Sequence, residues 1–315
     1  MPYQQYTVVE WMLFFYIYCF LGWCIESTFV SVNEKKFVNR GFMRGPFLPL
    51  YGSGAVIMLF VTIPVRDNLI LTYIFGAIGA TILEYVTGVV MEALFKVRYW
   101  DYSDQPFNLN GHICLGTTLA WGGLTILMTK VIHAPVEHLV MSLDPQFKGI
   151  LVLVLTVVIA ADFSLSFKAA LDIRDLLSKM TVAREELNRI QSRLDAIIAF
   201  TSGEAKSIFS QQTENTKDRI SAILQGIKSR LDFLQKTDRI QESAPIKSLT
   251  QFRDEIEQLK AKYFVEDEHR RTLSDRLGSF RKNMLKSHPT ISSPKFSEAL
   301  KELKEIAEEK HHKED

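Results

Sequence analysis

Four acidic residues lie inside stretches of the chain that are otherwise apolar, which makes them the first candidates for chemistry. They are Glu26, Glu84, Glu92 and Asp162. A charged side chain within hydrocarbon costs roughly 2.5–3.5 kcal/mol on insertion scales, so each carboxyl group should face protein or water instead of lipid. Two interpretations stay open: the carboxyl groups bind a ligand, an ion or a proton, or they pair with loop arginines and only hold helices together.

The spacing around two of these acids predicts how they are positioned. Small residues and carboxylates recur every four residues, at Gly76, Ala80, Glu84, Gly88 and Glu92. On a helix, residues four apart lie on one face, so this repeat predicts a single stripe. Small residues let a neighbouring helix approach closely, and the acids would then point into that contact.

Two arginines, Arg40 and Arg44, follow the first apolar stretch in a segment rich in glycine and proline. Guanidinium groups on such a constrained turn could hold a lipid phosphate or another anion. The alternatives are that they neutralise the acidic stripe or lie among anionic lipid headgroups.

A second polar loop contains Trp100, Asp101, Tyr102 and Asn108. Trp and Tyr side chains suit the membrane interface, whereas Asp and Asn favour turns. We therefore expect this loop either to cap the helix bundle as a structured turn or to form a polar gate over a cavity lined by the acids of the stripe.

Most other chemistries have no signature in this sequence. The chain contains no P-loop, no G-x-S-x-G, no H-E-x-x-H and no C-x-x-C motif, and His112 beside Cys114 supplies too few ligands for a zinc site. We expect no enzyme activity, no metal and no cofactor; the enzymatic alternative is lipid-headgroup chemistry with Asp101 or Glu84 as base. The net charge of +1 argues against nucleic acid as a partner, and three cysteines make no disulfide framework.

The elements that must position these residues are membrane helices. Residues 1–167 hold 9 Lys/Arg and 11 Asp/Glu, whereas residues 168–315 hold 28 and 25, so a membrane part is joined to a water-soluble part. Five apolar stretches approach or exceed the roughly 20 residues that cross a hydrocarbon core. They are residues 8–32, 47–65, 69–95, 113–133 and 149–171, within a transmembrane domain of residues 1–168. Pro49, Gly52 and Gly54 interrupt the second stretch, whose start could be broken or partly re-entrant.

The distribution of basic residues predicts the orientation. Loops 33–46 and 96–112 carry six Lys or Arg, whereas the alternate connections carry only Arg66 and Lys148. The positive-inside rule then places the N-terminus outside and the C-terminus in the cytoplasm, in a multi-pass protein of the cell membrane. With a rise of about 1.5 Å per residue, all four buried acids fall in the cytoplasmic half of the lipid bilayer.

Several of these motifs together resemble one family of membrane proteins, the CmpB-like proteins described as ABC-transporter type IV. The matching residues are Leu21-Gly22-Trp23-Cys24-Ile25-Glu26, Phe37-Val38-Asn39-Arg40-Gly41-Phe42, Gly45-Pro46, Tyr51-Gly52, Leu83-Glu84-Tyr85-Val86-Thr87-Gly88, Glu92, Trp100-Asp101-Tyr102-Ser103, Pro106-Phe107-Asn108 and Gly111. The resemblance covers about residues 10–135 and implies a permease-like role, without assigning catalytic or substrate-binding residues. Because the chain has no ATPase motif, ATP-driven transport would need a separate ATPase subunit.

Residues 169–315 have the pattern of a cytoplasmic helical region. Apolar residues from Ile173 to Ile197 alternate spacings of three and four, which predicts a coiled-coil seam continuing the fifth span. An uncovered seam either folds back as a helical hairpin or pairs with another chain, so self-association or a cytoplasmic protein partner is expected. Breaks are expected near residues 201–203, 243–245 and 289–294, a polar interruption of the apolar pattern lies at residues 264–272, and a disordered tail is expected from Lys310.

We therefore predict an all-α, polytopic integral membrane protein with five transmembrane helices and a cytoplasmic coiled-coil or helical-hairpin domain. Its predicted function is that of a permease-like component of a transport system, with a polar cavity open toward the cytoplasm. Glu84 and Glu92 would form the centre of this cavity, and Arg40 and Asp101 its rim. The alternative is a non-transporting membrane anchor whose cytoplasmic helices recruit partners.

Overall fold

The computed structural model describes residues 6–200, 220–221, 224–229, 232, 244–275, 278–288 and 290–309. These residues form helices joined by short loops, and the only strand-like pairings among them are two isolated bridges. The prediction of an all-α chain is confirmed.

Two compact units divide the chain. One unit combines everything up to Leu177 with the chain from Leu277 onward, and the other consists of Ser178–Arg276. The long helix α6 (Pro145–Phe200) begins in the first unit and ends in the second.

The first unit contains helices that are long and apolar enough to cross a membrane. Among the described residues these are Val8–Glu34 (α1), Leu69–Phe95 (α3), Leu115–Ser142 and the apolar part of α6. Leu115–Ser142 consists of α4 (Leu115–Leu127), a π-helical turn (Met128–Ile132) and α5 (His133–Ser142). The second predicted span is a shorter helix, α2 (Pro49–Thr62), extended by a 3₁₀ turn to Val65. Several helices with the length and apolar composition of membrane spans are thus present in the described part of the chain, while the count of five spans stays a prediction.

Local sequence explains where the first and third helices begin and end. Thr7 and Glu10 form a capping box at the start of α1, and Asn68 caps the first turn of α3. Lys35 and Lys96 adopt the left-handed conformation that ends each helix.

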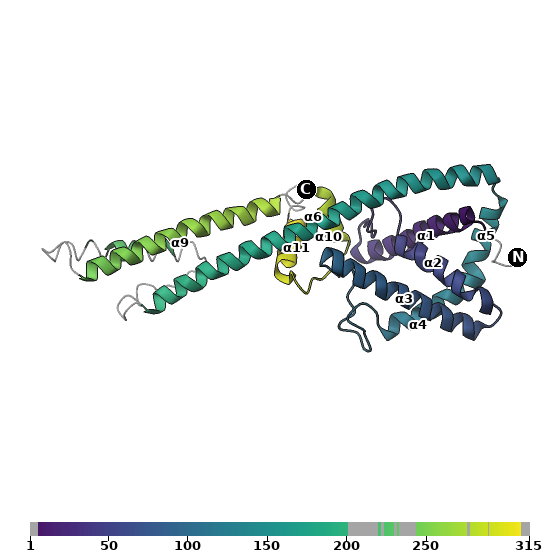
Figure 1. The fold of residues 1–315 in the computed structure, drawn as a ribbon, viewed down its shortest axis with the longest axis horizontal. Coiled ribbons are helices and arrows are strands. Elements are labelled where there is room, and N and C mark those ends of the chain that lie inside the picture. Colours follow the sequence, from purple (N-terminus) through teal and green to yellow (C-terminus); the bar gives the residue numbers. More distant parts are fainter. Residues whose placement is uncertain are drawn as a thin grey trace. The chain divides into compact units, whose positions relative to one another are not determined.

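Glycines allow the membrane helices to pack closely. A Cβ atom on Gly76 of α3 would lie 2.2 Å from Thr125 of α4, so the predicted small-residue stripe does face a neighbouring helix. A Cβ atom on Gly22 of α1 would lie 2.3 Å from the Tyr51 side chain of α2. Helix α2 therefore packs against α1 on one side and α3 on the other (Figure 1).

The second unit pairs two helices. The end of α6 and α9 (Ala244–Asp275) lie side by side and run in opposite directions (Figure 1), with Lys262 and Glu186 2.6 Å apart. Ile190 of α6 and Ile256 of α9 are buried. Helix α9 continues through residues 264–272, where the sequence suggested an interruption, because polar residues on an exposed face do not break a helix. The predicted break at 201–203 and the tail from Lys310 lie outside the described residues, and the coiled coil itself stays a prediction.

Two short helices complete the first unit: α10 (Ser279–Ser287) and α11 (Ser297–Glu309). The predicted last helix is confirmed, with Phe296, Leu300, Leu303 and Ala307 all buried.

Candidate functional site

A cavity of about 430 Å³ lies among the helices of the first unit. Its lining comes from α1, α2, α3, α4 and α6, from the loops that follow α1 and α3, and from the residue after α10. Five of the residues predicted from sequence line it: Glu26, Arg40, Glu84, Trp100 and Tyr102.

Glu26 and Arg40 form a neutralised pair on one side of this cavity. Arg40 Nε lies 3.9 Å from Glu26 Oε2, and the Tyr51 hydroxyl donates a 2.5 Å hydrogen bond to Glu26 Oε1. Gly22, one turn before Glu26 on α1, leaves the room that brings Tyr51 so close. Arg40 also donates through Nη1 to the Ser287 carbonyl at 2.8 Å. Burial lowers the pKa of the Arg40 guanidinium, and Glu26 opposes that shift.

Glu84 also lines the cavity, in a different electrostatic setting. Glu84 is only 5% exposed, and its carboxylate accepts hydrogen bonds from Trp121 Nε1 at 2.9 Å and from the Tyr102 hydroxyl at 3.3 Å. Of the ion pairs formed by the described residues, none includes Glu84. The carboxyl group is therefore oriented by neutral donors and has no cationic partner.

The rest of the wall is apolar. Phe42 of the first loop lies 5.9 Å from Phe163 of α6 between ring centroids, and Phe95 of α3 lies 5.1 Å from Phe167. Further apolar lining comes from Leu48, Pro49, Leu50, Leu83, Val90, Met91 and Leu94. The cavity thus combines two carboxyl groups and one guanidinium with a wall that suits an apolar ligand.

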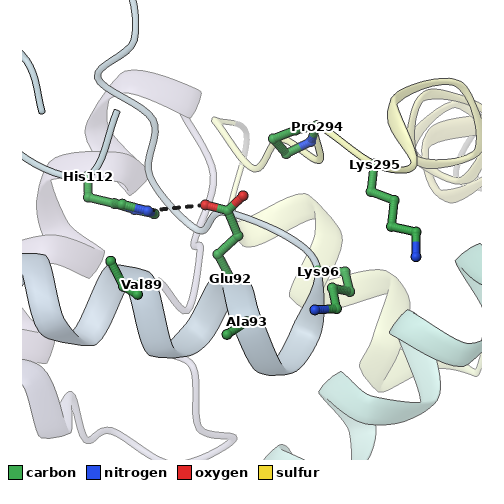
Figure 2. Close-up of a pocket in the computed structure, with 7 residues that line it drawn as sticks. All are labelled: Val89, Glu92, Ala93, Lys96, His112, Pro294 and Lys295. Carbon is green, nitrogen blue, oxygen red and sulfur yellow. Dashed lines mark ion pairs between the residues drawn. The ribbon is translucent and has the colours of Figure 1, made fainter. Parts of the chain in front are cut away.

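Glu92 faces another pocket, although it shares helix α3 with Glu84. It lies 2.8 Å from Arg98 Nε and 3.1 Å from His112 Nε2. Figure 2 shows Glu92 and His112 pointing toward each other in a pocket of about 300 Å³ that also includes Lys96 and Lys295. The hydrogen bond to Glu92 raises the pKa of Arg98. This pocket shares no lining residue with the larger cavity, so the structure does not bring Glu92 and Glu84 into one hollow.

Asp101 belongs to the same charged group as Glu92. It lies 3.6 Å from Arg98 Nη1 and accepts hydrogen bonds from Ser103 Oγ and Ser292 Oγ at 2.5 Å and 2.6 Å. Burial alone would raise the pKa of Asp101, but these hydrogen bonds hold it below its usual range. Asp101 therefore fastens the loop and is not among the residues lining the larger cavity.

Asn108 and Trp100 also stabilise the loop between α3 and α4. Asn108 Nδ2 donates to the carbonyls of Ser103 and Gln105 at 3.0 Å and 2.8 Å, and Trp100 Nε1 donates to the His112 carbonyl at 3.0 Å. The loop is a structured turn, with Trp100 also lining the cavity.

Asp162 and Arg44 lie outside the cavity lining. Asp162 of α6 accepts from the backbone N–H groups of Arg44 and Gly45 at 3.2 Å and 2.7 Å, and so it holds the first loop against α6. The Arg44 guanidinium lies 4.2 Å from the ring centroid of Phe280 on α10, in a cation–π contact.

One residue of the cavity lining, His288, comes from the C-terminal part of the chain, directly after α10. His288 packs edge-on against Tyr99, with 5.1 Å between ring centroids. Burial, together with the nearby Arg40 guanidinium, lowers the pKa of His288 to about 3, so the imidazole is neutral at physiological pH. The backbones of Arg98 and Ser292 exchange hydrogen bonds of 2.8 Å and 3.0 Å. The pairing of Arg98 with Ser292 was not predicted from the sequence, because neither segment has a residue pattern that indicates which other segment it contacts.

A buried ion pair at the start of α1 was also missed. Glu10 Oε1 lies 2.7 Å from Lys148 Nζ, and both residues are buried. The signal in the sequence was an acid and a base at the starts of the first and fifth predicted spans, which lie on the same side of a membrane when successive spans alternate in direction.

Within the described residues, no group of three or more His, Cys, Asp or Glu could hold a metal ion. Residues 13–167 match the sequence model of a family described as Putative ABC-transporter type IV. No curated protein and no solved structure matches the chain significantly. The matched segment begins within α1, includes α2 to α5 and ends within α6, and it contains every lining residue of the cavity except His288. The resemblance seen in the sequence is thereby confirmed over residues 13–167, which match the family described as Putative ABC-transporter type IV.

Proposed function

We propose that this chain is the permease-like membrane component of a transport system, and that the cavity between Glu26 and Glu84 is where the transported molecule binds. One observation carries the proposal: a cavity of about 430 Å³ among apolar helices is lined by a buried carboxyl group without a cationic partner and by many apolar side chains. An ionisable residue that faces such a cavity in a membrane protein is typical of a substrate or ion pathway.

The positions of the other acids support the choice of this cavity. Glu92, Asp101 and Asp162 each contact basic side chains or backbone N–H groups. Such contacts are typical of residues that stabilise loops and helix packing. We propose that five spans, with the N-terminus outside, place the cavity in the cytoplasmic half of the bilayer. Energy from ATP would then come from a separate ATPase subunit on the cytoplasmic side.

Transport by native membranes and native purification test the proposal together. Vesicles are prepared from the native membranes of cells that express the chain, its Glu84→Gln variant or neither, so that any ATPase subunit is retained. The vesicles are incubated with ATP and a cell extract, and the trapped small molecules are identified by mass spectrometry. We expect at least one compound whose uptake or export depends on the chain and falls at least tenfold with Glu84→Gln. Identical contents in the three kinds of vesicle would reject a transport role. Co-purification from native membranes checks for the ATPase subunit.

A second candidate function is a membrane anchor that recruits cytoplasmic partners. It is favoured by the antiparallel pair of α6 and α9, which extends the chain beyond the family match. Deleting residues 178–276 separates the two functions. If the deletion variant loses partner binding but still transports, the permease is favoured. If it loses partner binding and neither the full chain nor the variant transports anything, the anchor is favoured.

A further inference from the structure

We propose that the cavity selects an organic cation that carries apolar groups, with Glu84 as its counter-ion. The inference rests on the proposed function, since it names the class of molecule that the transport site would take.

The charge balance of the lining is the first argument. Glu26 is paired with Arg40, and Arg40 is further engaged with the Ser287 carbonyl. His288 is the other basic residue of the lining; it is buried beside Tyr99, and its imidazole is neutral at physiological pH. Among the lining residues, Glu84 is therefore the ionisable group that no side chain of opposite charge balances. Ionising a buried carboxyl group without a partner is costly, and a bound cation would supply the missing charge.

The aromatic content of the wall is the second argument. Nine of the lining residues are aromatic: Phe42, Tyr51, Phe95, Tyr99, Trp100, Tyr102, Trp121, Phe163 and Phe167. Aromatic faces attract weakly hydrated organic cations, and the attraction grows when the charge is desolvated. Trp121 and Tyr102 also donate hydrogen bonds to Glu84, so aromatic rings and the carboxyl group converge on the same part of the cavity.

The same lining argues against a divalent metal ion. Ca²⁺ and Mg²⁺ require several oxygen ligands at short distances. In the part of the chain that the structure describes, no three or more Asp, Glu, His or Cys side chains lie close enough together to hold a metal ion. The volume of about 430 Å³ is that of a site for a drug-sized molecule.

Two ions of the same shape and opposite charge test the proposal. Tetraphenylphosphonium is an organic cation with four phenyl groups, and tetraphenylborate is its anionic counterpart. Binding of each to the purified full chain is measured by isothermal titration calorimetry at pH 7.5. We expect the cation to bind at least tenfold more tightly than the anion, and Glu84→Gln to weaken cation binding at least tenfold.

Glu92→Gln is the matched control, because it makes the same substitution on the same helix outside the cavity lining. We expect it to change cation binding by no more than about threefold, since its charge is distant and already paired. The elution profile of each variant on size exclusion establishes that it is folded. Equal binding of both ions, preferential binding of the anion, or cation binding that survives Glu84→Gln would each overturn the proposal.

Failure of this inference and failure of the proposed function give different results. If the chain binds the cation through Glu84 but transports no compound into or out of vesicles, the ligand class is supported and the transport function is rejected. A chain that transports an anionic or neutral compound through a step sensitive to Glu84→Gln, without binding the phosphonium ion, rejects the ligand class and leaves transport standing.

Discussion

The hydroxyl of Ser292 donates a 2.6 Å hydrogen bond to Asp101, a residue 191 positions earlier in the chain. Nearby, the Ser293 hydroxyl donates to the Lys96 carbonyl at 2.6 Å. These bonds attach the segment between α10 and α11 to the loop that follows α3. The residues next to the cavity therefore come from both ends of the chain, which makes this attachment the first feature to test.

A pair of cysteines tests the attachment directly. Arg98 and Ser292 form an antiparallel, hydrogen-bonded pair, for which Cα atoms about 5.5 Å apart are typical, within the range that a disulfide spans. In a chain whose Cys19, Cys24 and Cys114 are replaced by alanine, Arg98→Cys with Ser292→Cys should cross-link within one molecule on mild oxidation. The measurement is a mobility shift on a denaturing gel. Each single cysteine serves as control, and cross-linking only between molecules would contradict the described contact.

Acidification should release the segment that carries His288. Its pKa falls from the ordinary 6.5 to about 3 on burial, so the undocked segment binds a proton that the docked one does not. Docking is therefore fully stable above pH 6.5 and weakens as the pH falls from 6.5 toward 3, by about 2 kcal/mol at pH 5. Hydrogen exchange of residues 284–292 at pH 7.5 and pH 5.0, corrected for intrinsic rates, measures the loss of protection. His288→Asn keeps a donor near the Met284 carbonyl and should remove the pH dependence.

Gly76 and Gly123 form a matched pair for the packing of α3 on α4. A Cβ atom on Gly76 would lie 2.2 Å from Thr125, whereas one on Gly123 meets nothing within 4 Å. Gly76→Ala should destabilise the chain by about 1–3 kcal/mol through overpacking. Gly123→Ala should be neutral or stabilise by up to about 1 kcal/mol, because alanine is the better helix former. Thermal unfolding followed by size exclusion checks both, and equal midpoints would mean that α3 and α4 are not so close.

The Glu10–Lys148 pair should show strong coupling in a double-mutant cycle. Removing one partner leaves the other charge buried and unpaired, so Glu10→Gln and Lys148→Met should each cost about 3–5 kcal/mol. The double variant should recover most of that loss, since neither charge remains. Unfolding midpoints of the four proteins give the coupling energy. Additive losses would show that the two side chains do not interact.

Membrane helices were predictable because their signal is local. An apolar stretch of the right length must be helical in lipid, where its backbone groups have no other hydrogen-bond partner, and residues 8–32 and 69–95 agree closely with α1 and α3. The stripe from Gly76 to Gly88 likewise follows from helical spacing alone. Helix α2 was harder to predict because Pro49 and the glycines after it shorten the apolar run.

Tertiary structure alone decided which acids share a hollow. Glu84 and Glu92 are two turns apart on one helix, but eight residues add a rotation of about 80°, enough to turn one toward the cavity and the other toward Arg98. The contact of the segment between α10 and α11 with the loop after α3 could likewise not be predicted from the sequence. Its hydrogen bonds are made by Ser side chains and backbone groups, which are common to most loops. Hydropathy and spacing are properties of neighbouring residues and can be read along the chain. The charge state of a cavity depends on which distant side chains reach it, and only the folded arrangement determines that.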